Sequence, residues 1–335
     1  MTFTFKSNAT RHTLTLVPVA AALALAGPAL AQTNDTSLSF DANVEIDTDV
    51  LGGKQRTTNY DMGGRLEFNL FGEHRVGDHF VRGRGTALLL EDGDTATDDM
   101  WGMVGSERWD VQIGRFEGFD LFPKGKDTIL EHAGDVQVFE ANGARGRADE
   151  GGQFAAHFHP TDALSFELGT IFAEGDKTKA FTGVRPAVFY AGSGFSVTAG
   201  LEHVKFDAED EETGVIGEAV DHNGAGLNLA LDVAEARVNL NAAYKDDNLD
   251  NDVDDVLTLG ANVIYGPFGV GYIHSREDDS SDSDPHVNSL YAAYTVPFFA
   301  LENANVTFAA TSSYTNSAGG NDELHGGRVR FFYAF

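Results

Sequence analysis

Arginines occur at every second position in two parts of the chain, as Arg82 and Arg84 and again as Arg328 and Arg330. Side chains two residues apart in an extended strand point to the same face, so each pair presents two guanidinium groups side by side. Guanidinium groups bind carboxylates and other oxygen acceptors through charge-assisted hydrogen bonds. Together with Arg65, these residues predict a basic wall that attracts, orients or filters polar solutes. Asp41 and Glu45 of the first strand are expected to lie among the arginines.

A second segment rich in functional groups runs from residue 117 to about residue 150 and lacks the alternation of a strand. Its acids include Glu117, Asp120, Asp127 and Glu131. Acids held across an aperture from arginines would create a transverse field, which orients dipolar solutes and filters ions. The alternative is that the arginines pair with neighbouring acids and only hold the wall in shape.

Aromatic residues accompany this acidic segment. Phe116, Phe119, Phe122 and Trp101 are candidates for stacking on the apolar faces of sugar rings, while charged groups bind the hydroxyls. Interior packing of the three phenylalanines is an equally open reading.

Catalysis and metal binding find weaker support. His157, His159 and Ser165 offer the residue types of a hydrolase, but no nucleophile motif surrounds any serine. The chain contains no cysteine, which excludes disulfides, thiolate metal sites and a cysteine nucleophile. Acidic stretches at 246–255 and 277–284 do not match the twelve-residue calcium loop. We therefore expect no catalytic residue, no metal and no cofactor.

The elements that position these residues have a hydrophobic period of two. Residues 65–70, Arg-Leu-Glu-Phe-Asn-Leu, alternate between polar and apolar side chains, as a strand with one wet and one oily face does. The pattern predicts about sixteen strands, near 38–46, 60–71, 80–90, 100–105, 109–116, 151–159, 164–172, 181–191, 195–206, 221–231, 236–245, 256–265, 268–274, 286–296, 304–314 and 324–335.

The connections alternate between tight turns, such as residues 192–194, and long polar loops, such as residues 207–220. Short turns at one end and long loops at the other are typical of an outer-membrane barrel. The last strand is amphipathic and ends on an aromatic residue, Phe335, as bacterial outer-membrane proteins do. We predict an all-β, transmembrane, antiparallel barrel with short periplasmic turns, long extracellular loops and a constriction loop after the fifth strand. A soluble β-sandwich is the weaker alternative.

The N-terminus predicts export. A basic start with Lys6 and Arg11, an apolar run over residues 14–26 and the Ala29-Leu30-Ala31 site indicate a cleaved signal peptide at residues 1–31. The barrel would then occupy residues 32–335. The formal net charge of −29 excludes nucleic-acid binding through a basic surface and favours cations near the channel mouth.

Residues 112–128, QIGRFEGFDLFPKGKDT, resemble the segment that leads into the constriction loop of raffinose-type glycoporins. The resemblance is clear over this stretch and covers the rest of the barrel in outline. It implies a homotrimeric, water-filled channel. The positions that match the family segment are Arg115, Glu117, Asp120, Lys124, Lys126 and Asp127.

The sequence thus predicts a bacterial outer-membrane channel, not an enzyme, for passive diffusion of small hydrophilic solutes, with oligosaccharides as candidates. Membrane lipid and lipopolysaccharide are the expected surroundings. One alternative is a general, cation-preferring diffusion porin without sugar affinity. Less favoured alternatives are an outer-membrane enzyme and a receptor.

Overall fold

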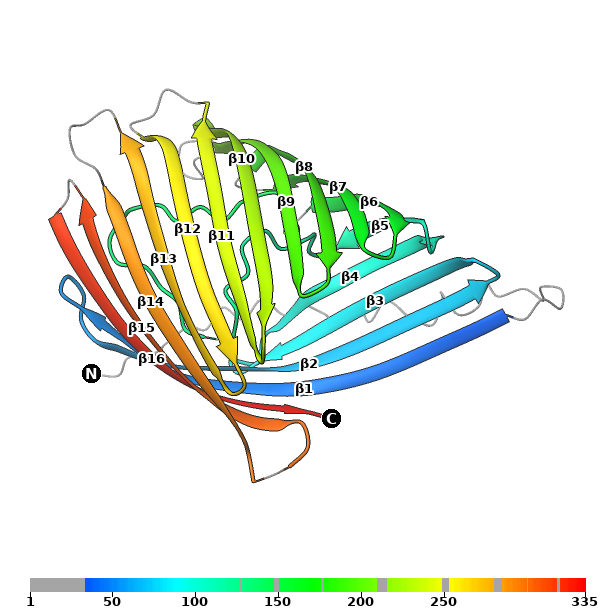
Figure 1. Cartoon of the computed structure of the whole chain (residues 1–335), viewed down its shortest axis with the longest axis horizontal. Helices are drawn as coiled ribbons and strands as arrows, with labels where there is room; N and C mark the ends of the chain where they lie inside the picture. Colours follow the sequence, from blue (N-terminus) through cyan, green and yellow to red (C-terminus); the bar gives the residue numbers. More distant parts are fainter. Residues whose placement is uncertain are drawn as a thin grey trace, which may run out of the picture.

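The computed structural model describes residues 34–335, except residues 127, 148–150, 176–177, 210–215, 249–252, 280–284, 300 and 318–319. The proposed signal peptide lies outside these residues. Sixteen strands form one closed antiparallel barrel, as predicted (Figure 1). They are β1 (Asn34–Gly53), β2 (Asn59–Val76), β3 (His79–Leu90), β4 (Thr95–Ser106), β5 (Trp109–Arg115), β6 (Gly151–Thr161), β7 (Leu164–Gly175), β8 (Thr178–Gly192), β9 (Phe195–Glu209), β10 (Ile216–Val233), β11 (Ala236–Asp247), β12 (Val253–Tyr265), β13 (Phe268–Asp279), β14 (His286–Pro297), β15 (Ala304–Ser317) and β16 (Gly320–Ala334).

The barrel closes where the first strand meets the last. β1 pairs with β16 from Asn43 opposite Ala334 to Gly53 opposite Leu324. The C-terminal residue takes part in this seam, because the amide of Phe335 donates to the carbonyl of Ala42 at 2.8 Å. Closure leaves no unpaired strand edge, which a barrel in a bilayer requires.

Side chains alternate between the two faces of the wall. On β7, Phe166 and Leu168 are 43% and 48% exposed, whereas Glu167 between them is 4% exposed. The outward face is therefore apolar, as lipid contact requires, and the polar set points into the barrel. No helix in the described part of the chain is both long and apolar enough to cross a membrane.

The strands are longer than the alternation predicts. The alternation predicts a strand over 38–46, whereas β1 extends over Asn34–Gly53. It predicts another over 221–231, whereas β10 extends over Ile216–Val233. Strand pairing continues beyond the predicted bounds, for example between Thr48 and Met62.

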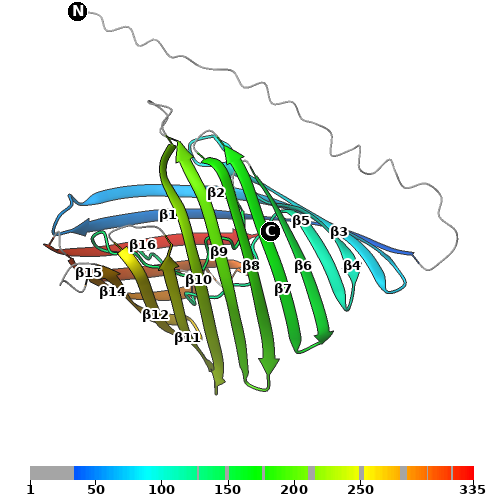
Figure 2. The ribbon, with the colours of Figure 1, turned by 90° about the horizontal axis from the view of Figure 1, so that it is seen from above.

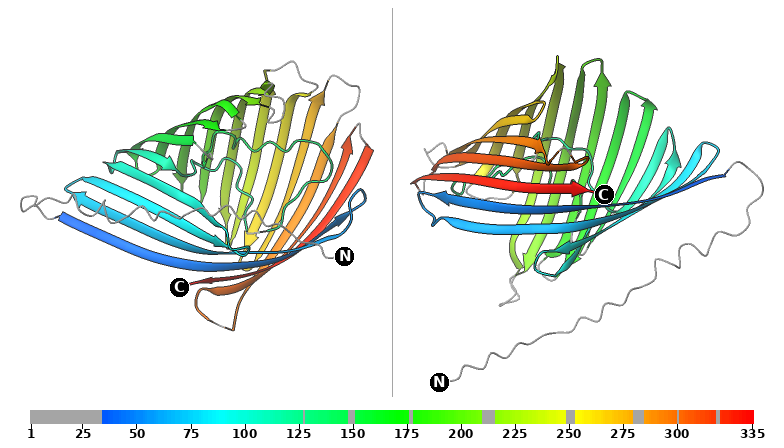
Figure 3. Two further views of the ribbon diagram at one scale, coloured as in Figure 1. Left: turned by 180° about the vertical axis from the view of Figure 1, so that it is seen from behind. Right: turned by 90° about the horizontal axis from the view of Figure 1, so that it is seen from below.

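The segment between β5 and β6 lies inside the ring of strands, as the views from above and below show (Figures 2 and 3). We call the described residues of 116–147 the inner loop. Its side chains supply half of a buried apolar cluster, whose other half comes from the inward face of the wall. This cluster contains Leu121, Phe122, Phe139, Ala141, Ala243, Val256, Ile273 and Tyr291.

Two glycines allow the inner loop to leave the sheet. Gly114, at the end of β5, has φ +127°, and a Cβ there would lie 2.2 Å from the carbonyl oxygen of Met100. Gly146, at the other end of the loop, has φ +138°, and a Cβ there would lie 2.0 Å from the carbonyl oxygen of Phe116. Both positions exclude a side chain by conformation and by space.

Candidate functional site: the lumen and its inner loop

The inner loop starts and ends as one hydrogen-bonded pair of segments. Glu117 and Gly146 form a bridge, the amide of Gly118 donates to the carbonyl of Arg145 at 2.8 Å, and the amide of Arg147 donates to that of Phe116 at 3.1 Å. From this base the loop makes a first arm, residues 117–131, and a second arm that returns to residue 147.

The first arm is fixed to the inward face of β7, β11, β12 and β14. The carbonyl of Pro123 accepts from the side-chain amides of Asn241 at 3.0 Å and Asn262 at 2.7 Å. The next carbonyl, that of Lys124, accepts from the hydroxyl of Tyr291 at 3.0 Å. These bonds satisfy backbone groups that would otherwise be buried without partners.

The second arm is fixed farther round the wall. The amide of Ala133 donates to Ser313 Oγ on β15 at 2.9 Å. The amide of Gly134 donates to Asp322 on β16 at 3.2 Å, and that of Phe139 donates to Thr258 Oγ1 on β12 at 3.0 Å. The two arms together cover the inward face from β7 to β16.

Arg185 on β8 holds both arms at once. Its side chain is 1% exposed; it donates to the carbonyl of Phe119 at 2.6 Å and to that of Ala141 at 3.4 Å. Glu167 lies 3.4 Å from this guanidinium, and Glu202 lies 4.0 Å from it. The same two carboxylates accept from loop amides, Glu167 from Phe119 at 3.1 Å and Glu202 from Ala144 at 3.1 Å.

The five arginines of the predicted wall lie on β2, β3 and β16, which neighbour one another through β1. We call Arg65, Arg82, Arg84, Arg328 and Arg330 the arginine wall. Each of them pairs with a carboxylate of the same wall: Arg65 with Glu45 and Glu67, Arg82 with Glu73, Arg84 with Asp99, Arg328 with Asp49, and Arg330 with Asp47.

Acids are therefore interleaved with the arginines, and Glu45 of the first strand is one of them. The acids are supplied by cross-strand positions: Asp47 is the register partner of Arg330, and Asp49 that of Arg328. Facing side chains of opposite charge stabilise an antiparallel pair. Positive and negative side chains therefore alternate along the arginine wall. This pairing with neighbouring acids is the structural alternative that the sequence left open for these arginines.

Ion pairs join the inner loop to the arginine wall and to the neighbouring β1–β2 connection. At its base, Asp99 accepts from Arg147 at 3.0 Å and lies 3.5 Å from Arg84. At the turn between the arms, Glu131 lies 3.7 Å from Arg56, in the connection between β1 and β2. The base of the loop is therefore tied to the arginine wall through Asp99, and the turn between its arms is tied to the β1–β2 connection through Arg56.

The residues matched to the glycoporin segment have mixed roles. Arg115 braces the loop base, since it donates to the carbonyls of Asp98 at 2.9 Å and Arg147 at 2.8 Å. Lys126 donates to the carbonyl of Gly266 at 3.3 Å. Asp127 lies outside the described residues.

The other matched residues pair within the loop and not with the arginine wall. Glu117 lies 3.3 Å and Asp120 lies 3.8 Å from Arg145, and Lys124 lies 2.9 Å from Glu140. The loop acids thus reach the lumen already partnered by loop cations.

The aromatic candidates divide into two groups. Phe116 and Phe122 are each 3% exposed and pack inside the protein, so neither ring has a free face for a solute. Phe119 is half-buried and its ring centre lies 6.2 Å from that of Phe189. Trp101 is half-buried and forms an edge contact with Phe71 at 6.3 Å.

The residue types of a hydrolase meet on the wall formed by β5, β6 and β7. His159 Nδ1 lies 2.9 Å from Ser165 Oγ and its Nε2 lies 3.0 Å from Asp110. Asp110 also accepts from His157 at 2.6 Å. Ser165 lies within a regular strand, and not on a sharp strand-to-helix turn that would expose a nucleophile.

Sequence reasoning missed Arg185 and its carboxylate partners as the anchor of the loop. A signal was available in the glycines of the inward face. A Cβ on Gly226 would lie 2.8 Å from Leu121, and one on Gly260 would lie 2.7 Å from Phe122. Glycines on the inward face of nearby strands, here β10 and β12, indicate that another segment approaches the sheet closely there.

Solved structures of an outer-membrane protein and of porins share this architecture. In-vitro folded OmpT of Vibrio cholerae, in its trimer form, superimposes with a TM-score of 0.66 at 12% identity, over 89% of this chain and 100% of that one. The anion-selective porin of Comamonas acidovorans gives 0.61 at 14% identity, over 90% and 100%. A variant of the Rh. blastica porin gives 0.53 at 14% identity, over 89% and 100%. These identities are low, so the likeness concerns the fold.

No curated protein sequence is significantly similar to the chain. A family comparison does find a match: the sequence model of the porin-like glycoporin RafY matches residues 30–335, nearly the whole chain. The sixteen-strand barrel and the long segment after β5 agree with the architecture that the hydrophobic alternation predicted. The chain belongs to the family of porin-like glycoporins represented by RafY.

Proposed function

We propose that this chain is a channel for passive diffusion of small hydrophilic solutes across the bacterial outer membrane, with oligosaccharides among its cargo. The observation that carries the proposal is that the inner loop lies inside the barrel (Figure 2) and is tied by ion pairs to the arginine wall. The loop covers the inward face of the barrel from β7 to β16. The remaining passage is therefore bounded by the charged groups of the loop on one side and by the arginine wall on the other.

Charged groups on both sides are accessible to solutes. The side chain of Arg65 is 40% exposed on the wall, and those of Glu131 and Asp120 are 48% and 43% exposed on the loop. Opposed charges across a narrow, water-filled passage give a transverse field. The net charge of −29 adds a preference for cations.

Sugar transport is supported by the two half-buried aromatic candidates. Trp101 lies opposite Arg84 in the β3–β4 register and in edge contact with Phe71. Phe119 lies on the first arm. An aromatic face beside charged hydrogen-bonding groups suits a sugar, which has apolar C–H faces and a hydroxyl rim.

Export and assembly belong to the same proposal. Cleavage after Ala31 would release the barrel to the periplasm, and the apolar outward face would meet outer-membrane lipid and lipopolysaccharide. A homotrimer is proposed, with the trimeric fold relative in support. We propose no enzymatic activity, no cofactor and no nucleic-acid partner.

Single-channel conductance of the refolded chain in a planar bilayer tests this function. Steady conductance that raffinose or maltose partly blocks is the expected result. Open conductance that no sugar reduces would leave a general cation-preferring porin, and a folded barrel without conductance would favour a receptor.

A hydrolase is the second candidate, because of the chain of contacts through Ser165, His159 and Asp110. Its geometry brings the three residue types of a triad together. Incubation with a fluorophosphonate probe distinguishes the two functions: we expect no labelling at Ser165. Labelling that disappears in Ser165→Ala would support the hydrolase.

A further inference from the structure

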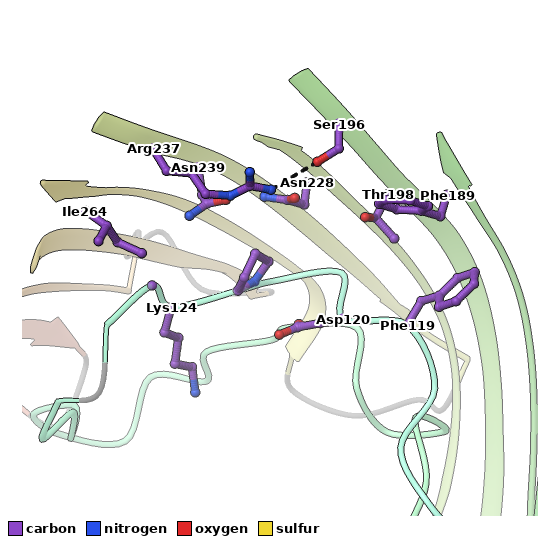
Figure 4. A pocket seen from close by; sticks show the side chains of 12 residues that line it. Phe119, Asp120, Lys124, Phe189, Ser196, Thr198, Asn228, Arg237, Asn239 and Ile264 are labelled. Atoms are coloured by element: carbon purple, nitrogen blue, oxygen red, sulfur yellow. Dashed lines mark hydrogen bonds between the residues drawn. The ribbon is translucent and has the colours of Figure 1, made fainter. Parts of the chain in front are cut away.

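A cavity of about 520 Å³ lies between the first arm of the inner loop and the inward faces of β8 to β12 (Figure 4). Ser196 and Arg237, which border it, are each the second residue of a strand that follows a short turn. The cavity is therefore on the short-turn side of the inner loop. Its volume is within the range of about 300 to 1,000 Å³ that is common for small-molecule sites.

One side of the cavity is aromatic. Phe119 from the loop and Phe189 from β8 meet at 6.2 Å between ring centres, with the ring planes at 56°. Figure 4 shows both rings at the same end of the cavity. Both side chains are half-buried, so they keep accessible ring surface. Such rings accept the C–H face of a flat, polar ligand.

The floor of the cavity is a row of amides with fixed orientation. Asn228 donates to Asn241 at 2.8 Å, and Asn239 donates to Asn262 at 2.7 Å. The acceptors Asn241 and Asn262 in turn donate to the carbonyl of Pro123. One N–H of each outer amide is used in this relay, which leaves its second N–H and its carbonyl oxygen for a ligand.

Thr198 stands beside this row, opposite Asn228 in the β9–β10 register. Its side chain is on the inward face and 7% exposed. A hydroxyl next to an amide that offers both a donor and an acceptor matches the groups of a neighbouring pair of sugar hydroxyls.

The charges around the cavity are balanced. Arg237 lies 3.0 Å from Asp232, and Lys124 lies 2.9 Å from Glu140. Asp120 lies 3.8 Å from Arg145. A net ionic ligand would have to compete with these pairs, whereas an uncharged ligand need not.

We infer that this cavity is a binding subsite for the ring of a neutral sugar on the short-turn side of the inner loop. The inference rests on the proposed channel function and adds to it a second binding step, after the passage between the loop and the arginine wall. A solute then binds Phe119 and Phe189 with its C–H face and the amide row with its hydroxyls.

The test is the block of single-channel current by maltose, added on the short-turn side, in four variants of the full chain. Thr198→Val removes one hydroxyl at constant shape, and Phe189→Leu removes one ring. Each should weaken the block about threefold to tenfold, the loss that corresponds to one hydrogen bond or one aromatic contact. Phe189→Tyr keeps the ring and should keep the block.

Thr307→Val is the matched control. Thr307 on β15 is also inward and 4% exposed, but it lies on strands far from the cavity, and its variant should bind maltose as the parent does. Glucosamine and glucuronate should block more weakly than maltose.

The outcomes separate the inference from the function on which it rests. Absence of conductance from the folded parent would contradict the channel itself. Conductance whose maltose block is equal in the parent, Thr198→Val and Phe189→Leu would overturn the subsite and leave the channel intact, as would conductance that maltose does not reduce.

Discussion

At the scale of single residues, Arg185 is the side chain on which the position of the inner loop depends most. It is buried, donates to carbonyls of both arms and lies between Glu167 and Glu202. Removal of one member of a buried ionic cluster leaves the others uncompensated, at about 3 to 5 kcal/mol.

Arg185→Met should therefore lower the free energy of unfolding by about that amount and make the single-channel current noisier, because both arms lose their common anchor. Arg237→Met is the control: Arg237 and Asp232 have 47% and 53% exposed side chains, and an exposed pair contributes about 0 to 1 kcal/mol. Denaturant unfolding of the two variants checks the difference. Equal losses would contradict the anchoring role.

His132, on the second arm, makes the attachment of the loop depend on pH. Burial, with a smaller effect from nearby Lys124, lowers the pKa of His132 from 6.5 to about 4. Its Nδ1 lies 2.7 Å from Ser289 Oγ on β14. The detached loop takes up a proton more readily than the attached one, so the attachment is fully present above pH 6.5 and weakens as the pH falls toward 4.

The fluctuations of single-channel current should accordingly increase between pH 6.5 and pH 4 in the parent. His132→Asn keeps a hydrogen-bonding group without a titration, and should remove the histidine-dependent part of this increase. If the two proteins have identical pH profiles, protonation of His132 does not affect the loop.

Residue types predicted which groups face the lumen, but not their partners. The spacing of Arg328 and Arg330 gave their common face correctly. Their carboxylate partners, Asp49 and Asp47, lie at the other end of the chain and depend on the register of the closing seam. Phe116 and Phe122 are buried, whereas Phe119 is half-buried. The difference depends on the direction in which the loop turns at each residue, and no local sequence pattern indicates that direction.

At the scale of elements, the base of the inner loop depends on two glycines. Gly114 lies within residues 112–128, and Gly146 pairs with Glu117 of that segment. A side chain in a left-handed conformation costs about 1 to 2 kcal/mol. Gly146→Ala should lower the free energy of unfolding by more than this, because its Cβ would also lie 2.0 Å from the carbonyl oxygen of Phe116.

Gly93→Ala separates the two effects. Gly93 also has positive φ, +91°, but a Cβ there would meet nothing within 4 Å. Denaturant unfolding should show a small loss for Gly93→Ala and a larger one for Gly146→Ala. Similar losses would mean that the loop base tolerates a side chain.

The existence of the elements was predictable and their ends were not. Alternation identified sixteen strands because lipid outside and water inside impose a period of two. It underestimated the lengths of β1 and β10. The inner loop was recognisable as a long gap, but its path depends on inward glycines and polar side chains of strands from β7 to β16, which only the closed barrel brings together.

At the scale of the whole molecule, the net charge of −29 predicts selectivity for cations. The reversal potential in a gradient of KCl should show preference for K⁺ near 0.1 M salt and a weaker preference near 1 M, since the Debye length falls from about 10 Å to about 3 Å. Glu117→Gln with Asp120→Asn should reduce the preference at low salt. A preference for Cl⁻ would contradict this assignment.

The central claim is that solutes pass between the inner loop and the arginine wall. The chain has no cysteine, so a single introduced thiol can be labelled alone. A bulky methanethiosulfonate reagent should lower the single-channel conductance in steps in Asp120→Cys and in Arg82→Cys, and should leave it unchanged in Glu107→Cys, on the exposed turn between β4 and β5. Complete labelling of Asp120→Cys and Arg82→Cys with no change of current would contradict the account.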